Sequence, residues 1–348
     1  MTRTLAVLAL AGLTGSGMGG DCLWRQDIRI RDPFILADAS TRTYYLYEAK
    51  PGYGGAEVCV YASEDLEHWT PKREVMKCDP KLDVRGTWAP EVTKRNGRYY
   101  LAVSLTLPPD PQRPLRMIPP DLAWRPNGGP EFVDGQGPMR DPFPRGTWLY
   151  ESDSPLGPFR ELSGRPITPP DWMVIDGTLF EVDGNPWMMM AHEYRQTGVG
   201  TMDVVPLSDD LLRPLGRPKP MWRADVLEKG NRIAEGPYVR RAKSGGLHAI
   251  WSGFAAFGGK EDAYVVAVSQ STSGRAEGPW TYEGPLFKAN GGHAMIFDDF
   301  DGRTWIALHQ PNDGPKERLR LFEILETEGR LKLGREKPFA LKQGETKP

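Results

Sequence analysis

Cysteine and histidine are scarce in this chain of 348 residues, which has three of the first and five of the second. The three cysteines, Cys22, Cys59 and Cys78, allow at most one bridge and therefore exclude a disulfide framework. If one bridge forms, Cys59 and Cys78 are the pair expected, because they are the closer pair in sequence; whether they are bridged stays open. No C-x-x-C motif and no spaced Cys/His set is present, so no zinc site is predicted.

A large excess of one charge is also absent. The 44 Lys and Arg and the 46 Asp and Glu nearly cancel, to a formal net charge of −2, and there is no long basic run. Because nucleic-acid binding requires a surface that neutralises phosphates, we expect no nucleic-acid partner. No stretch reaches about 18 consecutive apolar residues, so we expect no membrane span.

The N-terminal segment has three parts. Arg3 precedes the apolar run Leu5–Leu13, and small residues follow, with a cleavage site expected near Gly17–Gly19. This order is typical of a secretory signal peptide, so residues 1–20 are predicted to be one and the protein to be secreted or periplasmic. A disordered N-terminus from a misplaced start is the alternative.

Turn-forming and aromatic residues are abundant, with 39 Gly, 33 Pro and 11 Trp. One pattern occurs five times: an acidic or polar residue beside Pro or Gly, an apolar strand, a tight turn and an aromatic-rich strand, followed by further strand. Asn96-Gly97, Asp183-Gly184 and Asp301-Gly302 are turns of the kind that two-residue hairpins require. Each copy is therefore predicted to be an antiparallel sheet of about four strands.

The copies keep a nearly constant period. Asp32 and Glu91 are 59 residues apart, Asp176 and Glu235 are 59 apart, and Glu235 and His293 are 58 apart. The longer step of 85 residues from Glu91 to Asp176 contains a Pro- and Gly-rich insert at about residues 107–145.

Five sheet units at this period, with no helical pattern between them, predict an all-β fold. The arrangement expected is a five-bladed β-propeller, with blades of about four antiparallel strands. Residues 21–348 are expected to form this single domain. Two packed sandwich domains are the alternative, but no linker divides the chain.

The first strand of each propeller blade lines the axis, so the five anchor residues are expected to converge at one end of the channel. Carboxyl groups brought together raise one another's pKa, which suits a general acid working opposite a general base. Taken singly, each has an ordinary explanation: Asp32 ends a strand beside Arg31, Asp176 and Glu235 are turn residues, and Glu91 is a solvated acid. Their shared phase favours a site.

The five motifs together resemble glycoside hydrolase family 43, the five-bladed propeller arabinofuranosidases and xylosidases. They are RDPFI, WAPEV, IDGTLF, EGPYV and GGHAMIF, which occur in the family's order between Arg31 and Phe297. The resemblance implies a glycosidase that hydrolyses O-glycosyl bonds of a carbohydrate, by inversion and without a cofactor in the chemistry.

The resemblance also implies a role for individual residues. Asp32 would be the general base, Glu235 the general acid, and Asp176 the residue that orients Glu235 and raises its pKa. His293 is similar to an axial histidine beside a central water or calcium ion, so a structural calcium in the channel is an open expectation. The residues implied to bind substrate are Trp88, Glu91, His293 and Arg318.

The expected substrates are terminal α-L-arabinofuranosyl or β-D-xylosyl residues of plant polysaccharides, with galactans or galactofuranosides as the alternative. The insert, which contains Trp124 and Phe132, is expected to cover the pocket mouth and favour exo attack. A surface loop remote from the site is the other interpretation of the insert.

Three other classes of propeller protein fit the motifs less well. A non-catalytic sugar-binding propeller would need no acid–base set. A fructan-acting enzyme would have an "NDP" motif where this chain has "RDP". A phosphorylase would need a basic cluster around phosphate, which is not identified in the sequence.

The letters RDPF occur twice, at Arg31–Phe34 and again at Arg140–Phe143. The second copy lies in the insert, off the repeat, and Pro144 follows it, which disfavours a central strand. Asp141 is therefore expected to be solvated or paired with Arg140 or Arg145. We predict that Asp32 is essential and Asp141 dispensable.

Overall fold

The structure, a computed structural model, describes residues 22–49, 55–118 and 143–342. The predicted signal peptide lies outside these residues. So do Trp124, Phe132 and Asp141 of the insert.

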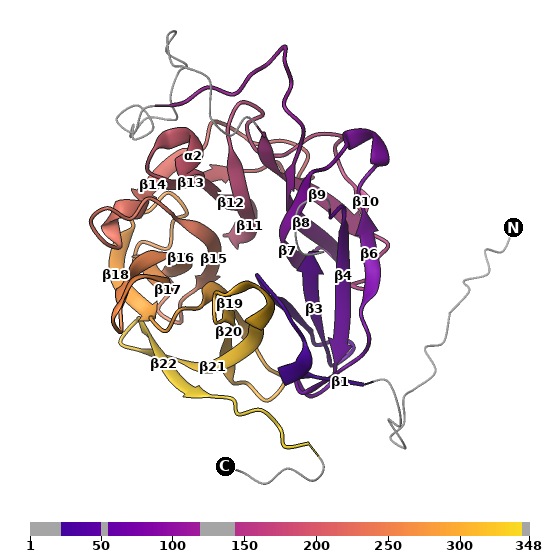
Figure 1. The fold of residues 1–348 in the computed structure, drawn as a ribbon, viewed down its shortest axis with the longest axis vertical. Coiled ribbons are helices and arrows are strands. Elements are labelled where there is room, and N and C mark those ends of the chain that lie inside the picture. Colours follow the sequence, from indigo (N-terminus) through magenta and orange to yellow (C-terminus); the bar gives the residue numbers. More distant parts are fainter. Residues whose placement is uncertain (1–21, 50–54, 119–142, 343–348) are drawn as a thin grey trace, which may run out of the picture.

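Five four-stranded antiparallel sheets form a ring around a central axis, so the predicted five-bladed β-propeller is confirmed (Figure 1). Strand order within each blade follows the chain, and the first strands lie nearest the axis. The first two blades are β2 (Phe34–Asp38), β3 (Thr43–Ala49), β4 (Glu57–Ser63) and β6 (Arg73–Lys77), then β7 (Gly86–Arg95), β8 (Arg98–Thr106), β9 (Arg145–Ser152) and β10 (Arg160–Glu161).

The remaining three blades repeat this order. They are β11 (Val174–Val182), β12 (Asn185–His192), β13 (Thr201–Pro206) and β14 (Lys219–Arg223); β15 (Glu235–Arg241), β16 (Leu247–Phe257), β17 (Lys260–Ser271) and β18 (Thr281–Phe287); and β19 (Gly292–Asp298), β20 (Thr304–Gln310), β21 (Arg318–Thr327) and β22 (Arg330–Glu336).

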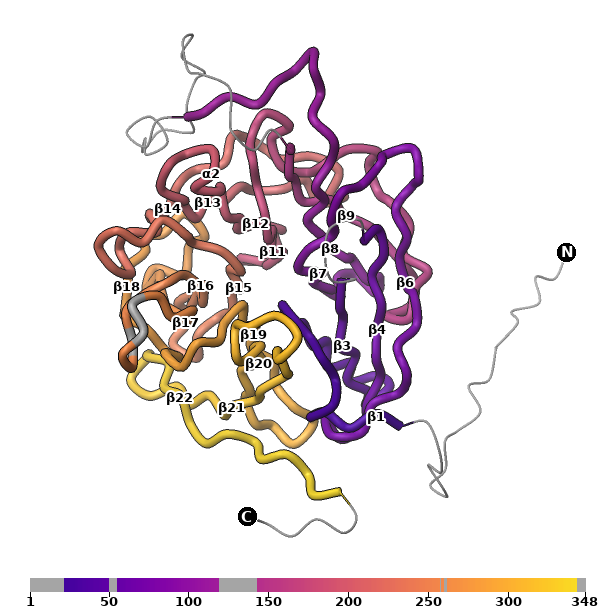
Figure 2. The backbone as a smooth tube through the Cα atoms, in the orientation of Figure 1, coloured from indigo at the N-terminus to yellow at the C-terminus, as the bar shows by residue number. Residues whose placement is uncertain are grey.

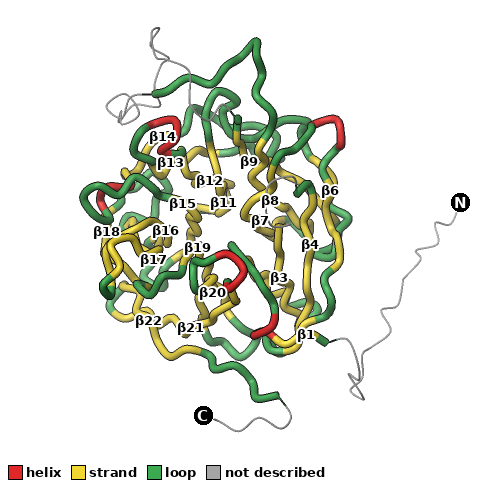
Figure 3. The backbone as a smooth tube through the Cα atoms, in the orientation of Figure 1, coloured by secondary structure: helices red, strands yellow, loops and turns green. Residues whose placement is uncertain are grey.

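Helices are few and short among the described residues, and they lie in the connections between strands (Figure 3). A two-stranded sheet, β1 (Leu23–Trp24) with β5 (His68–Trp69), flanks the first blade. The helices are η1 (Arg25–Asp27), η2 (Pro80–Leu82), α2 (Tyr194–Thr197), η3 (Ala224–Val226) and η4 (Gly314–Lys316).

The second strands of the blades read as nearly continuous apolar runs, because side chains on both of their faces are buried between neighbouring blades. In β20, for example, Trp305–His309 are all buried. Apolar clusters join blade five to blades one and two, blade two to three, blade three to four, and blade four to five. The ring is thus held together by packing at every blade interface.

The described chain begins beside blade one and ends just after blade five (Figure 2), and a charged side chain joins these two segments. Arg25 is buried, pairs with Glu67 at 3.1 Å, and donates to the carbonyl oxygens of Lys337 and Pro338 at 3.0 and 2.8 Å. These contacts join the segment before the first blade to the segment after the last strand. Loss of either charge would leave the other buried without a partner, which is strongly destabilising.

Cys59 and Cys78 are not bridged, because all three cysteines are free. The register of β4 with β6 sets Cys59 opposite Glu74, whereas the backbone N–H of Cys78 bonds to the carbonyl of Ala56. Three residues of strand separate the two positions, roughly 10 Å at about 3.3 Å per residue. A disulfide needs Cα atoms within about 7 Å.

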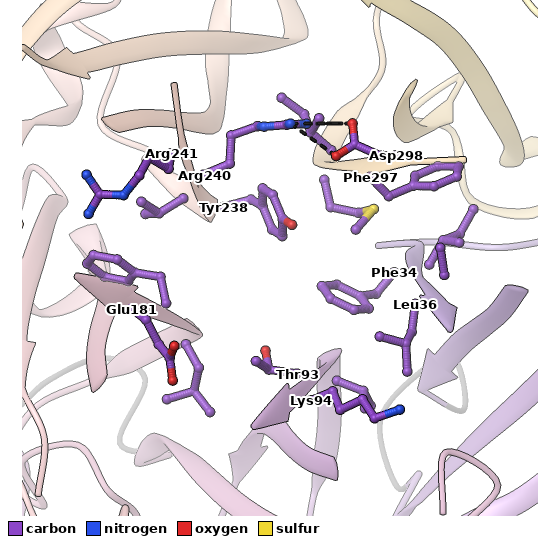
Figure 4. Close-up of a pocket in the computed structure, with 18 of the residues that line it drawn as sticks. Phe34, Leu36, Thr93, Lys94, Glu181, Tyr238, Arg240, Arg241, Phe297 and Asp298 are labelled. Carbon is purple, nitrogen blue, oxygen red and sulfur yellow. Dashed lines mark hydrogen bonds and ion pairs between the residues drawn. The ribbon is translucent and has the colours of Figure 1, made fainter. Parts of the chain in front are cut away.

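The axis is hollow on one side of the ring, where a channel of about 630 Å³ is lined by the first strands of all five blades. The aromatic side chains of Phe34 and Tyr238 point into it (Figure 4). Arg240 pairs with Asp298 across neighbouring blades at its rim, at 3.3 Å. A second, smaller pocket contains the carboxyl groups of Asp32, Asp176 and Glu235.

Candidate active site

Each blade has one bend residue with positive φ, which lies in the first strand or, in blade one, two residues before it. The φ values are 49° at Asp32, 44° at Ala89, 55° at Asp176, 56° at Gly236 and 49° at His293. In the last four strands the bend coincides with a shift in register against the second strand, as in a β-bulge. Bulges change the direction of side chains near functional sites. Here they lie at Asp176, Glu235 and His293, whose side chains line one pocket.

The residues at these bends and beside them form a pocket of about 260 Å³. It brings together five of the seven expected site residues, from all five blades. These five are Asp32, Trp88, Asp176, Glu235 and His293.

Asp32 is surrounded by cationic or donor groups. Its Oδ1 lies 3.2 Å from His293 Nδ1 and 3.7 Å from Arg31 Nε. Burial opposes ionisation of this carboxyl, but the His293 and Arg31 side chains outweigh it and hold the pKa of Asp32 below its usual value. Oδ1 is buried and accepts no hydrogen bond from the described residues.

Arg31 is held in place from the fifth blade. Its Nη1 donates to Glu317 Oε1 at 2.5 Å and to Asn312 Oδ1 at 3.0 Å. Because the Glu317 side chain is fully buried, the guanidinium stays beside Asp32 as a fixed positive charge.

Asp176 is linked to the strand of Glu235. The backbone N–H of Gly236 donates to Asp176 Oδ2 at 2.9 Å. Burial, followed by the negative charges of Glu235 and Asp32, raises the pKa of Asp176 well above its usual range. A side chain at Gly236 would meet the His293 ring at 3.0 Å, so only glycine allows this approach as well as the positive φ.

Glu235 is half-buried at the wall of the pocket, and its pKa is raised to about 7. Desolvation is the main cause and the Asp32 carboxylate adds to it, whereas a hydrogen bond from Tyr264 opposes the rise. Tyr264 Oη donates to Glu235 Oε1 at 2.7 Å. The lowered pKa of Asp32 thus favours its ionised form, whereas the raised pKa of Glu235 keeps its protonated form populated up to about pH 7.

Three charged residues of the pocket were missed from the sequence: Arg145, Glu193 and Arg195. Arg145 Nη1 lies 2.6 Å from Glu193 Oε2 in a buried ion pair, and the Glu193 charge contributes to the raised pKa values of Asp176 and Glu235. They lie at the start of β9, just after β12 and in α2, outside the first strands that the repeat pattern singles out. In the sequence, Glu193 and Arg195 directly follow the buried strand MMMAH, and charged residues at the end of such a strand could have indicated a site.

Two expected substrate-binding residues lie elsewhere. Glu91 stands two residues beyond the bend of β7 and is not among the described residues that line the pocket. Its burial raises its pKa to about 8. Arg318 closes the ring instead, since its Nε donates to the carbonyl oxygen of Gln26 at 3.1 Å.

Calcium near His293 gains no support from the side-chain arrangement. Among the described residues, no group of three or more His, Cys, Asp or Glu side chains is placed to hold a metal ion. The His293 ring is instead engaged by Asp32.

A propeller whose axial pocket holds one carboxyl favoured in the ionised form and another favoured in the protonated form has the side-chain set of a glycosidase. The comparison of the chain with protein families gives the same class. The model described as glycosyl hydrolases family 43 matches residues 27–337, and the chain belongs to this family.

Solved structures support the fold. The endo-arabinase from Bacteroides thetaiotaomicron VPI-5482 is 30% identical over 90% of this chain and 100% of that chain, with a TM-score of 0.72. The α-L-arabinofuranosidase from Lactobacillus brevis is 16% identical over 92% of this chain and 100% of that one, with a TM-score of 0.67. The xylan β-1,4-xylosidase from Bacillus halodurans C-125 is 17% identical over 92% of this chain and 59% of that one, with a TM-score of 0.61.

The comparison with curated proteins returned no match. Within the described part of the chain, none of the helices has the length and apolar character needed to span a bilayer.

Proposed function

We propose that the protein hydrolyses glycosidic bonds with inversion, using Asp32 as general base and Glu235 as general acid. The observation that carries the proposal is the pocket in which these two carboxyls, from opposite sides of the ring, have pKa values displaced in opposite directions. Two titratable groups whose environments separate their pKa values are the usual sign of an acid–base pair.

The reaction would take place in one displacement. Asp32 removes a proton from water, whose oxygen attacks the anomeric carbon, while Glu235 gives its proton to the leaving oxygen as the glycosidic bond breaks. Asp176 would hold the strand of Glu235 through the N–H of Gly236. The expected effect of Asp176 on the pKa of Glu235 stays a prediction, because the causes of that raised pKa are burial, Asp32 and Glu193. Trp88 and His293, which line the pocket, would contact the sugar.

Inversion can be tested on the first-formed product. We expect proton NMR to show the sugar released with the anomeric configuration opposite to that of the substrate, before mutarotation. An inverting enzyme leaves room for water between its two carboxyl groups, about 6.5–9.5 Å apart, whereas a retaining one needs about 5 Å. A retained anomer would overturn the assignment of Asp32 as base.

The substrates proposed are polysaccharides or oligosaccharides with terminal α-L-arabinofuranosyl or β-D-xylosyl residues, attacked from the chain end. The names of the similar structures, an arabinofuranosidase and a xylosidase among them, support this sugar class. Endo attack on arabinan is the second candidate, favoured by the 30% identity to an endo-arabinase. Galactan and galactofuranosides are further alternatives.

Product analysis separates the two modes. Exo action should release single sugars from the start of digestion of debranched arabinan or xylan, with little early fall in viscosity. Endo action should give oligosaccharides and a rapid fall in viscosity. The second pattern would replace the exo proposal without affecting the roles of Asp32 and Glu235.

Export is also part of the proposal. It is supported by the order of a basic residue, an apolar run and small residues over positions 1–20. A secreted or periplasmic location would bring the enzyme to polymeric carbohydrate.

A further inference from the structure

Tyr264 on β17 is buried directly behind the proposed acid. Its hydroxyl donates to Glu235 Oε1 at 2.7 Å. Its ring lies 5.1 Å from that of Phe254 and 5.6 Å from that of His309, stacked on the latter with 20° between the planes. A Cβ atom at Gly292 would come within 2.5 Å of the Tyr264 ring. These contacts leave the hydroxyl little choice of position.

His309 connects this tyrosine to the proposed base. The backbone N–H of Asp32 lies 3.3 Å from His309 Nδ1, and His309 Nε2 lies 3.3 Å from Asn312 Oδ1. Burial lowers the pKa of His309 to about 4, so the ring is neutral near neutral pH, with Nδ1 as acceptor and Nε2 as donor. The stack of Tyr264 on His309 therefore fixes the acid relative to the base.

We propose that Tyr264 is a positioning residue that holds Glu235 Oε1, so that Oε2 carries the proton given to the leaving oxygen. The proposal rests on the function proposed above for Glu235. Since Tyr264 does not line the pocket, its action on the substrate is indirect.

The hydrogen bond from Tyr264 to Glu235 has a different strength before and after proton transfer. While Glu235 is protonated, the tyrosine occupies Oε1 and leaves the proton on Oε2, facing the pocket. When that proton has moved to the glycosidic oxygen, the same hydroxyl donates to a carboxylate, a stronger charge-assisted bond. Tyr264 keeps its own proton throughout, because burial and the neighbouring Glu235 raise its pKa well above the usual value.

Tyr264→Phe removes the donor and keeps the stacked ring. Because a donor to the carboxylate favours the ionised form, its loss should raise the pKa of Glu235 by about one unit. The matched control is Tyr282→Phe: Tyr282 lies on β18 of the same blade, packs on Trp251 with ring centroids 6.2 Å apart, and does not line the pocket.

The direct measurement is a carbon-13 NMR titration of protein labelled at the glutamate side-chain carboxyls, with the Glu235 signal assigned by its loss in Glu235→Gln. We expect the Glu235 titration to move upward in Tyr264→Phe and to stay in place in Tyr282→Phe. An unchanged Glu235 titration in Tyr264→Phe, with the melting temperature of the wild type, would overturn the proposal.

Kinetics separate this proposal from the one on which it rests. In Tyr264→Phe the alkaline limb of kcat/KM should move upward with the titration, and kcat should fall more than KM changes. If the alkaline limb of kcat/KM persists in Glu235→Gln, Glu235 is not the general acid and the proposed function fails. The NMR titration would still show whether Tyr264 controls the pKa of Glu235. A lower kcat with neither limb nor titration moved would leave Tyr264 only a packing role.

Discussion

Replacing Asp32 by asparagine should lower kcat/KM by about 10²–10⁴-fold, the usual contribution of a general base. Asp32 Oδ1 is buried without a hydrogen bond from the described residues, beside His293 and Arg31, which favour its ionised form. Asparagine has nearly the same shape but cannot take a proton from water. The loss should appear in kcat, measured by initial rates, because binding of the sugar does not require this proton transfer.

The choice of asparagine matters because the backbone at Asp32 has a φ of 49°. Asparagine enters this left-handed region more readily than most residues, whereas alanine there adds strain. Asp32→Asn should therefore keep the melting temperature of the wild type, and Asp32→Ala should lower it in addition to the loss of activity. Comparing the two separates chemistry from folding.

Asp141→Asn is the matched sequence control, since Asp141 stands in the second RDPF and is expected to be dispensable. Activity within a few-fold of the wild type is expected for it. A folded Asp32→Asn with comparable activity would remove Asp32 from the mechanism, and a loss confined to Asp141→Asn would mean that the wrong copy had been chosen.

The propeller could be predicted from the sequence because its signal is repeated. Hairpin turns such as Asn96-Gly97 and the constant period give the blades, and the phase of the repeat gives Asp32, Asp176 and His293, which all lie at bends. The constant period of the repeat does not show where each strand has its bulge, and so does not show which side chains face the pocket. Glu235 lies one residue before its bend and still faces the pocket, whereas Glu91 lies two residues after its bend and does not.

Contacts between different strands of the fold were beyond the sequence. The Arg145–Glu193 pair joins residues 48 apart, and the Tyr264–Glu235 pair joins residues 29 apart. Neither belongs to a recurring motif, and each pair joins segments that are not consecutive in the chain. Cys59 and Cys78 show the same limit, since proximity in sequence says nothing about the register of β4 with β6.

Glu235→Gln should reduce hydrolysis of natural glycosides by about 10²–10⁴-fold and that of activated aryl glycosides much less. Glutamine cannot give a proton to the leaving oxygen, and an alkoxide leaving group needs that proton far more than a dinitrophenolate does. Its amide oxygen can still accept the hydrogen bond from Tyr264, so the fold of the site is kept. Rates on paired substrates with poor and good leaving groups measure the difference.

The pH dependence gives the same residue a second signature. Activity requires protonated Glu235, whose pKa is about 7, and so should fall as the pH rises through about 7. It also requires ionised Asp32, whose pKa is lowered, so the acid limb should lie below the ordinary aspartate value of about 3.9. In Glu235→Gln the alkaline limb should disappear from kcat/KM while the acid limb remains.

Glu91→Gln is the control that tests placement rather than charge. Glu91 is a second carboxyl on a first strand, it is buried, and its pKa is raised to about 8, yet it is not among the described residues that line the pocket. A raised pKa alone would make either residue a candidate acid, but only Glu235 is next to Asp176 and Asp32. Glu91→Gln should therefore retain the alkaline limb and the leaving-group dependence of the wild type. If the limb vanished there instead, the proton donor would be Glu91, and the pocket would have to open through the axis to reach it.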